Sequence, residues 1–144
     1  MKRLVISGLL VMLYVTNSVA QDAWKLERKD SDSKIKLETV VSGYLADLNG
    51  KYRLRVTETT FQPGGYVGEH HHAVPGMRYV AAGELTFNQA GKITIYKAGD
   101  TFYESGNVTH TAHNKGKDPV VLIITEIIPV DWKGGTAIQP KSKK

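Results

Sequence analysis

The chain has 144 residues, 41% of them hydrophobic, and a formal net charge of +5, which fits one globular domain of ordinary size. It contains no cysteine, so disulfides, thiolate metal ligands and a cysteine nucleophile are all excluded. The positive charge gathers near the two ends, in residues 2–3 and after residue 129, and no basic stripe with interleaved aromatic residues crosses the body. We therefore expect no nucleic-acid partner.

The first twenty residues have the layout of a secretory signal peptide. Lys2 and Arg3 are basic, residues 4–15 are mostly apolar, and residues 18–20 form a small-residue cleavage site. The apolar stretch is shorter than the roughly 20 residues that a membrane-spanning helix needs. An uncleaved membrane anchor is the alternative. We expect bacterial export, cleavage after Ala20, and a periplasmic or secreted mature chain that no longer contacts a membrane.

The mature chain opens with a polar stretch and then becomes strand-like. Residues 21–36 are polar and charged, which predicts an N-terminal extension with a loop at residues 30–33. Strands are expected at residues 37–45 and 51–61, because Asn49-Gly50 between them is a strong hairpin-turn signal.

Short strand-like segments separated by turns fill the rest of the body. Gly64-Gly65 is expected to interrupt the chain. Beyond it, the strand-forming segments are residues 77–82, 84–88, 92–96, 101–104, 108–113 and 119–128. The last segment is an apolar run, as expected for a strand buried on both faces. No long segment has helical periodicity, so about nine to eleven short strands predict an all-β sandwich or barrel over residues 37–130, followed by a basic C-terminal tail at residues 131–144.

All five histidines fall in two short runs, His70-His71-His72 and the pair His110 and His113. Side chains alternate faces along a strand, so His70 and His72 should point one way and His71 the other. Two imidazoles on one face, joined by His110 from a distant strand, make a facial arrangement suited to a divalent metal ion. The sequence therefore predicts a metal site at His70, His72 and His110.

The first histidine run resembles the first motif of the cupin superfamily. That motif is commonly written as Gly, five residues, His-x-His, three or four residues, Glu, six residues, Gly. Gly64, His70, His72 and Gly83 fall in register with it. The glutamate that serves the family as a metal ligand should stand at position 76, where this chain has Gly76.

The second run resembles the second cupin motif, written as Gly, five residues, Pro-x-Gly, two residues, His, three residues, Asn. Gly99, His110 and Asn114 match it, while Ser105 replaces the proline and Asn107 the glycine. Two motifs with correct internal spacing are a more specific signal than one. The resemblance implies a double-stranded β-helix, the cupin jelly-roll barrel, and a homodimer, since the family is often dimeric.

The missing glutamate changes the chemistry that the resemblance implies. Without it, three neutral imidazoles remain, and a bound ion keeps its full double charge and up to three open positions. Such an ion favours small polar or anionic substrates that chelate through oxygen or sulfur. Three-histidine cupins include thiol and diketone-cleaving dioxygenases, so Fe²⁺ is the favoured ion. Zn²⁺, Cu²⁺, Ni²⁺ and Mn²⁺ are alternatives.

Two side chains outside the metal site are candidate catalytic residues. Arg78 lies two residues beyond Gly76 and so shares its face, where a guanidinium could grip a substrate carboxylate. An internal ion pair between Arg78 and Glu58 is the alternative. Tyr103 could face the cavity and orient substrate, with core packing as the alternative. Glu69 and Glu104 flank the motifs and are candidate supporting or acid–base groups.

The leading hypothesis is an exported metal-dependent cupin enzyme, dioxygenase-like or of another metal-assisted type. A non-catalytic periplasmic cupin that binds or senses a small ligand is the alternative from a different class. A sugar-processing isomerase or lyase is a weaker alternative.

Overall fold

Nine β-strands make up the described part of the chain, residues 26–43 and 45–140 of the computed structural model. They are β1 (Arg28–Val40), β2 (Tyr52–His72), β3 (Gly76–Ala82), β4 (Glu84–Gln89), β5 (Lys92–Lys97), β6 (Thr101–Glu104), β7 (His110–His113), β8 (Val120–Pro129) and β9 (Ala137–Ile138). The all-β prediction is confirmed. The signal peptide predicted at residues 1–20 lies outside the described residues. Within those residues, no helix is long and apolar enough to cross a membrane.

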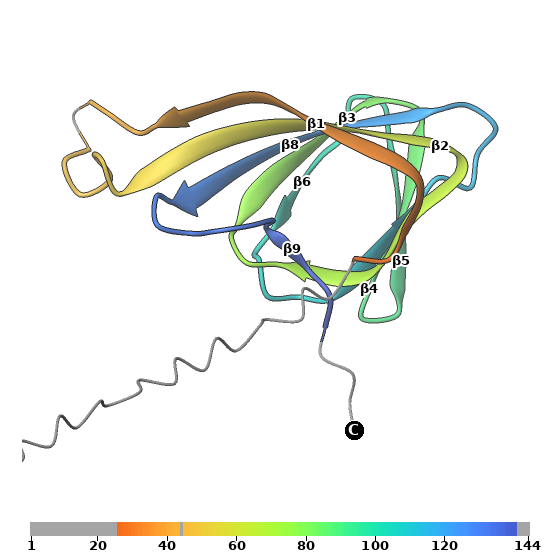
Figure 1. The fold of residues 1–144 in the computed structure, drawn as a ribbon. Coiled ribbons are helices and arrows are strands. Elements are labelled where there is room, and N and C mark those ends of the chain that lie inside the picture. The colour runs from red at the N-terminus through yellow and green to blue at the C-terminus, as the bar shows by residue number, and fades with distance from the viewer. Residues whose placement is uncertain (1–25, 44, 141–144) are drawn as a thin grey trace, which may run out of the picture.

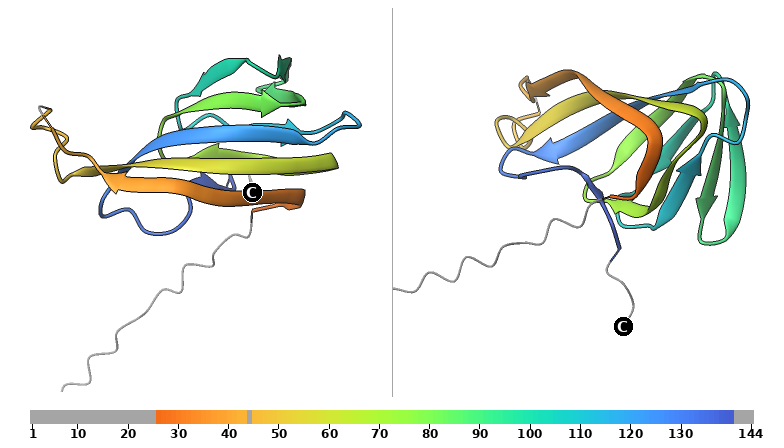
Figure 2. Two further views of the ribbon diagram at one scale, coloured as in Figure 1. Left: turned by 90° about the horizontal axis from the view of Figure 1, so that it is seen from above. Right: turned by 45° about the vertical axis from the view of Figure 1, so that its right-hand side comes forward.

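The strands form one sheet in the order β5-β4-β7-β2-β8-β3-β6, with β1 and β9 both paired to β2. This sheet curls into a nearly closed barrel (Figure 1). Antiparallel pairing predominates, and the long strand β2 lies beside β1, β7, β8 and β9. The connected ends of β1 and β2 extend beyond the barrel (Figure 2). The double-stranded β-helix expected from the resemblance is confirmed.

Three predicted boundaries were wrong. The loop predicted at residues 30–33 belongs to β1, where a register shift and a positive φ of 45° at Asp30 form a bulge. The predicted break at Gly64-Gly65 lies inside β2, which continues through it with Gly64 at φ 77°. The tail predicted from residue 131 contains β9 and the buried residue Thr136. Backbone pairing with β2 orders polar segments that carry no hydrophobic pattern.

The hydrophobic core lies inside the barrel and draws residues from several strands. Its buried cluster consists of Phe61, Val67, Val80, Leu85, Phe87, Phe102, Ala112, Val120 and Leu122. In β8 the buried positions alternate with partly exposed ones, and Ile127 is 42% exposed. The prediction that this strand is buried on both faces was therefore wrong, because one face of a barrel strand points outward.

The turn after β7 depends on the buried side chain of Asn114, which matches the last position of the second motif. Its Nδ2 donates to the carbonyls of Phe61 (3.0 Å) and Asp118 (2.8 Å), and its Oδ1 accepts from the amide of Gly116 (2.9 Å).

We expect Asn114→Ala to lower the free energy of unfolding by about 2–3 kcal/mol, because buried polar groups lose their partners. Urea unfolding checks this. Lys115→Ala, at the exposed neighbouring position, should change it by less than about 0.5 kcal/mol. Equal values for the two variants would contradict the role of the amide.

Candidate metal centre

The two histidine runs meet inside the barrel. His70 and His110 are directly paired across β2 and β7, and one ring nitrogen from each of His70, His72 and His110 lies within 4.8 Å of the others. All three side chains are buried. His71 instead lies where β2 pairs with β9, and His113 stacks on Tyr66 with ring centroids 5.2 Å apart. The structure therefore brings together the three histidines that the sequence singled out.

A bulge in β2 turns the histidines inward. Between Val67 and His70 the strand advances three residues, while its partner β7 advances two, from Ala112 to His110. One extra residue reverses the face on which later side chains project. Odd-numbered Val67 faces the core, and so do even-numbered His70 and His72. Without this bulge the two imidazoles would point to the outside of the barrel.

Backbone carbonyls orient two of the three rings. Nδ1 of His70 lies 2.8 Å from the carbonyl oxygen of Gly68, and Nδ1 of His110 lies 3.0 Å from that of Val108. A carbonyl can only accept, so each Nδ1 carries the proton of the neutral ring. Nε2 of each ring is therefore left with a free lone pair. This is the tautomer in which a histidine binds a metal through Nε2.

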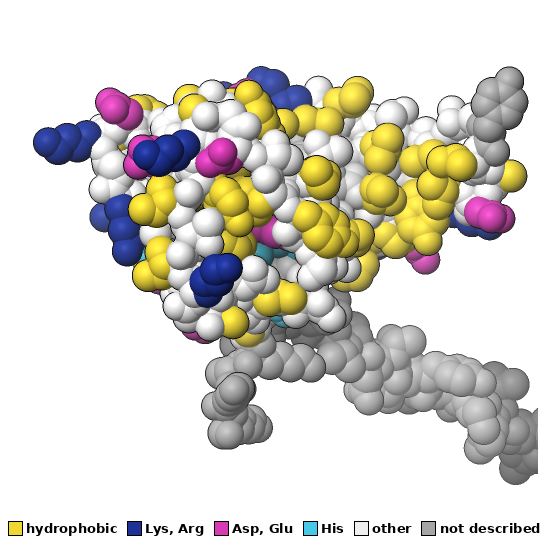
Figure 3. All heavy atoms as spheres, turned by 180° about the vertical axis from the view of Figure 1, so that it is seen from behind, with side chains coloured by type: hydrophobic (Ala, Val, Ile, Leu, Met, Phe, Trp, Pro, Cys, Tyr) yellow, Lys and Arg dark blue, Asp and Glu magenta, His cyan; other side chains and the backbone are white. Residues whose placement is uncertain are grey.

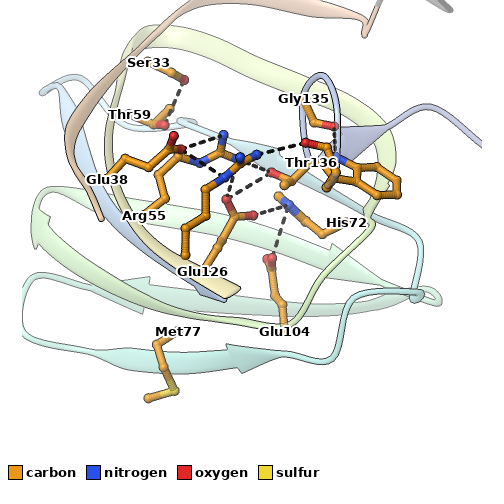
Figure 4. A network of polar contacts seen from close by, with 12 residues as sticks. Ser33, Glu38, Arg55, Thr59, His72, Met77, Glu104, Glu126, Gly135 and Thr136 are labelled. Carbon is orange, nitrogen blue, oxygen red and sulfur yellow. Dashed lines mark hydrogen bonds and ion pairs between the residues drawn. The ribbon is translucent and has the colours of Figure 1, made fainter. Parts of the chain in front are cut away.

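His72 lies between two buried carboxylates (Figure 4). Its Nδ1 is 3.2 Å from Oε1 of Glu126, and its Nε2 is 3.2 Å from Oε2 of Glu104. The other oxygen of Glu104 is 3.3 Å from Nε2 of His110. Glu126 thus contacts His72 from behind, while Glu104 lies on the side to which the Nε2 atoms point.

Burial keeps His70 and His110 neutral. Burial and the neighbouring His110 lower the pKa of His70 from 6.5 to about 3, and burial also lowers the pKa of His110. Neutral imidazole is the form that donates a lone pair to a metal ion. Near neutral pH these two side chains are therefore available as ligands.

Two arginines and two glutamates form an ion-pair network beside the histidines. Arg78, fully buried, has Nη2 2.5 Å from Oε2 of Glu104 and 3.9 Å from Oε1 of Glu126. Arg55 pairs with Glu126 at 3.0 Å, and the hydroxyl of Thr136 donates to the same carboxylate at 3.0 Å. Burial raises the pKa of Glu126, but hydrogen bonds from His72, Thr136 and Arg55 outweigh it and lower that pKa to about 2.

Arg78 lies on the inward face, as predicted. Its ion-pair partners are Glu104 and Glu126, and not Glu58 as in the alternative prediction. Glu58 faces away from the interior and pairs with Lys36 at 3.3 Å, so an Arg78–Glu58 pair is not formed. A Cβ atom at residue 76 would collide with Nη1 of Arg78 and with the carbonyl oxygen of Thr125. Gly76 therefore leaves the space that the arginine head occupies, which gives a physical reason for the absence of a glutamate there.

Both positions considered for Tyr103, in the cavity and in the core, were wrong. Its side chain is 63% exposed on the outer face of β6, whereas its neighbours Phe102 and Glu104 are buried inside. Glu69 is exposed. The alternation with apolar Phe102 was the signal that could have placed Glu104 inside and Tyr103 outside.

The histidines line one part of a cavity of about 380 Å³ within the barrel. Its polar lining near the histidines comprises Arg55, His70, His72, Arg78, Glu104, His110, Glu126 and Thr136, and Arg28, Ser33, Thr57 and Thr59 line the cavity elsewhere. Its apolar lining includes Leu26, Phe61, Val67, Leu85, Phe87, Phe102, Leu122 and Ile124. Sequence reasoning missed Arg55, Glu126 and Thr136, which come from three distant segments and carry no motif. The volume suits a small organic ligand.

The donor set fits a divalent metal ion. Three imidazoles converge at a buried point beside a carboxylate, and no thiolate is present in the chain. Nitrogen and oxygen donors of this kind suit Fe²⁺, Mn²⁺, Zn²⁺, Ni²⁺ and Cu²⁺, and they do not select one of them. The cluster is therefore a candidate divalent-metal site whose preferred ion is open.

Comparison with known families supports the fold. A family model described as "Cupin domain" matches residues 57–126, a range that contains all three histidines. No curated protein matches the chain.

Solved structures with this fold have different roles. An RmlC-like cupin from Shewanella frigidimarina is 22% identical with a TM-score of 0.52, covering 74% of this chain and 87% of that one. The polyketide cyclase RemF from Streptomyces resistomycificus is 14% identical with a TM-score of 0.54, covering 76% and 77%. A Cupin_2 domain of an XRE family transcriptional regulator from Enterobacter cloacae is 18% identical with a TM-score of 0.51, covering 68% and 96%. At these identities the likeness concerns the fold alone.

Proposed function

The chain belongs to the cupin superfamily, and we propose that it is a metal-dependent enzyme acting on a small molecule in the barrel cavity. The observation that carries this proposal is the convergence of three buried histidines on the wall of a cavity large enough for a ligand. A cavity without such donors would support binding only. A histidine cluster without a cavity would support a structural metal.

The residues have separate roles in this proposal. His70, His72 and His110 would hold a divalent ion, with Fe²⁺ favoured and Zn²⁺, Cu²⁺, Ni²⁺ and Mn²⁺ as alternatives. When bound, such an ion supplies Lewis acidity and, in the case of iron, the redox chemistry of a dioxygenase-like reaction. Glu126 orients the His72 ring through Nδ1, and the buried surroundings exclude water from the reacting centre.

The cavity lining favours a particular kind of substrate. Arg55 and Arg78 are opposed by Glu104 and Glu126, so the protein groups at the polar part carry no net charge in the ionised state. The double charge of the ion would then attract an anionic head group. Most of the other large side chains that line the cavity are aliphatic or aromatic, beside the polar residues Arg28, Ser33, Thr57 and Thr59, which favours a body that is mainly apolar. We therefore expect a small anionic chelator with an apolar portion, and these walls speak against a sugar, the substrate of the weaker alternative.

A non-catalytic binding or sensory cupin is the second candidate. The observation that favours it is the pairing of each charged group beside the histidines with an opposite charge, which leaves no obvious acid or base free. The regulator domain from Enterobacter cloacae has the same fold, and the polyketide cyclase does as well, so the fold does not decide between these roles.

Export and self-association are part of the proposal but rest on other grounds. A periplasmic or secreted location rests on the sequence of residues 1–20 alone. A homodimer rests on the family resemblance, and exposed apolar side chains offer a surface for it. Apolar atoms gather over the extension formed by the ends of β1, β2 and β8 (Figure 3), where Leu37, Leu54 and Ile127 are 55%, 38% and 42% exposed.

Oxygen uptake and ligand binding, measured on one preparation, separate the two candidate functions. Protein loaded anaerobically with Fe²⁺ would be mixed with thiols and with 1,3-diketones, and oxygen consumption and products would be recorded. An enzyme is expected to consume oxygen only when protein, iron and a suitable compound are all present. A compound that raises the melting temperature without turnover, with every ion tested, would favour the binding role instead.

A further inference from the structure

We infer that Glu104 is a fourth metal ligand, supplied by β6 in place of the carboxylate that the family motif would put on β3. The inference rests on the proposed metal site. It concerns a residue at a position that the second motif leaves variable, and it changes the charge and selectivity expected of the site.

The strand register places the two positions side by side. Gly76 of β3 and Glu104 of β6 are directly paired, and so are Arg78 and Phe102. Directly paired residues project on the same face with Cβ positions about 5 Å apart. Gly76, Arg78, Phe102 and Glu104 are all buried, so this shared face is the interior. A glutamate side chain spans roughly that offset, and its carboxylate can therefore reach the place that a glutamate at 76 would have served.

The contacts of the carboxylate point to a cation. Its oxygens lie 3.2 Å from Nε2 of His72 and 3.3 Å from Nε2 of His110. In His110 the ring proton faces the carbonyl of Val108, so Nε2 meets Glu104 with a lone pair. Two acceptors at this distance repel each other. A cation between them makes both into ligands, and the carboxylate side chain is only 8% exposed to competing water.

The ion pair with Arg78 fits this role. Nη2 of Arg78, 2.5 Å from Oε2 of Glu104, holds the carboxylate toward the histidines. The same arginine occupies the space beside Gly76 that a motif glutamate would need. Relative to the family motif, Arg78 takes the space of the motif glutamate, and Glu104 supplies a carboxylate from the neighbouring strand β6.

The inference predicts a site with three imidazoles and one carboxylate. A single negative ligand lowers the charge on the ion's complex from two to one. Carboxylate oxygen suits Mn²⁺, whereas imidazole binds Cu²⁺ well without it. Loss of the carboxylate should therefore weaken Mn²⁺ binding more than Cu²⁺ binding.

Metal titration of apoprotein tests this. We expect Glu104→Gln to weaken Mn²⁺ binding on the order of 100-fold, with a smaller change for Cu²⁺, and to alter the visible spectrum of bound Co²⁺. Glu69→Gln, which removes an exposed carboxylate beside His70, should leave both affinities and the spectrum unchanged. Parent-like Mn²⁺ affinity and an unchanged Co²⁺ spectrum in Glu104→Gln would overturn the inference.

A double variant distinguishes metal binding by Glu104 from neutralisation of the Arg78 charge by Glu104. Glu104→Gln/Arg78→Gln removes one charge of each sign. If Glu104 acts only by neutralising Arg78, the double variant will bind Mn²⁺ as the parent does, which also overturns the inference. If Glu104 is a ligand, binding stays weak. A parent that takes up no metal at all would refute the proposed function and this inference together. If the parent binds metal and Glu104→Gln binds Mn²⁺ with the same affinity, only the inference about Glu104 is refuted.

Discussion

The His70→Ala/His110→Ala protein is expected to contain no bound divalent metal, whereas the parent should contain about one equivalent. The two substitutions remove a directly paired couple from β2 and β7 and leave His72 as the single remaining imidazole of the cluster. One imidazole cannot hold an ion against exchange with water and buffer. Elemental analysis after dialysis checks this, on protein made without a histidine tag and reconstituted in parallel with each candidate ion.

Thermal unfolding gives an independent measurement of the same site. An ion present at 100 times its dissociation constant stabilises the folded parent by about 2.7 kcal/mol, and the double variant should gain nothing. His71→Ala/His113→Ala is the matched control, because it also removes two histidines but neither belongs to the cluster. Its metal content should equal that of the parent. No metal in the parent with any ion, or undiminished metal in the His70/His110 variant, would refute the metal site.

The metal found directs the search for activity. Iron in the parent would lead to oxygen-uptake assays with thiols and diketones. Zinc would lead to hydrolytic and isomerase assays, because zinc-bound water becomes acidic near neutral pH.

Arg78→Gln is expected to lower the free energy of unfolding by about 3–5 kcal/mol. The guanidinium is fully buried and opposes the carboxylates of Glu104 and Glu126. Removing one member of a buried ion network leaves the other members charged in a poorly solvated place, which costs more than the loss of a surface pair. Urea denaturation of apoprotein, followed by a spectroscopic signal, gives the two free energies.

Two other variants serve as controls for the predicted loss of stability in Arg78→Gln. Lys36→Gln breaks a pair with Glu58 in which the side chains are 50% and 31% exposed, so it should cost less than about 1 kcal/mol. The double variant Glu104→Gln/Arg78→Gln should be more stable than Arg78→Gln, because it removes the unopposed carboxylate as well. A loss below about 1 kcal/mol in Arg78→Gln would mean that water reaches the network, against the burial described here.

Short-range patterns predicted much of the fold and the core of the site. Turn residues and apolar runs located β3 to β8 within a few residues, since strand propensity and turn chemistry are local properties. Alternation along a strand put His70 and His72 on one face, and motif spacing added His110.

Two features account for the wrong predictions. One is backbone pairing of β1 and β9 with β2, and the other is the question of which residues of a strand face inward. The polar residues at the start of β1 and the two residues of β9, Ala137 and Ile138, form strands because β2 offers backbone hydrogen bonds, which need no hydrophobic pattern. In the four-residue strand β6, a shift of one position exchanges inside and outside. Tyr103 accordingly lies on the outer face, and Glu104 lines the cavity.

The strand-rich architecture, the lack of cysteine ligands and the grouping of three histidines could be predicted from composition, strand alternation and motif spacing. The charged groups around the histidines could not, because they are brought there by long-range strand pairing. The contacts of Glu104, Arg78 and Glu126 depend on the register among β3, β6 and β8. The inward turn of the histidines depends on a bulge measured against β7. Both are relations between segments far apart in the chain, and no local pattern encodes them.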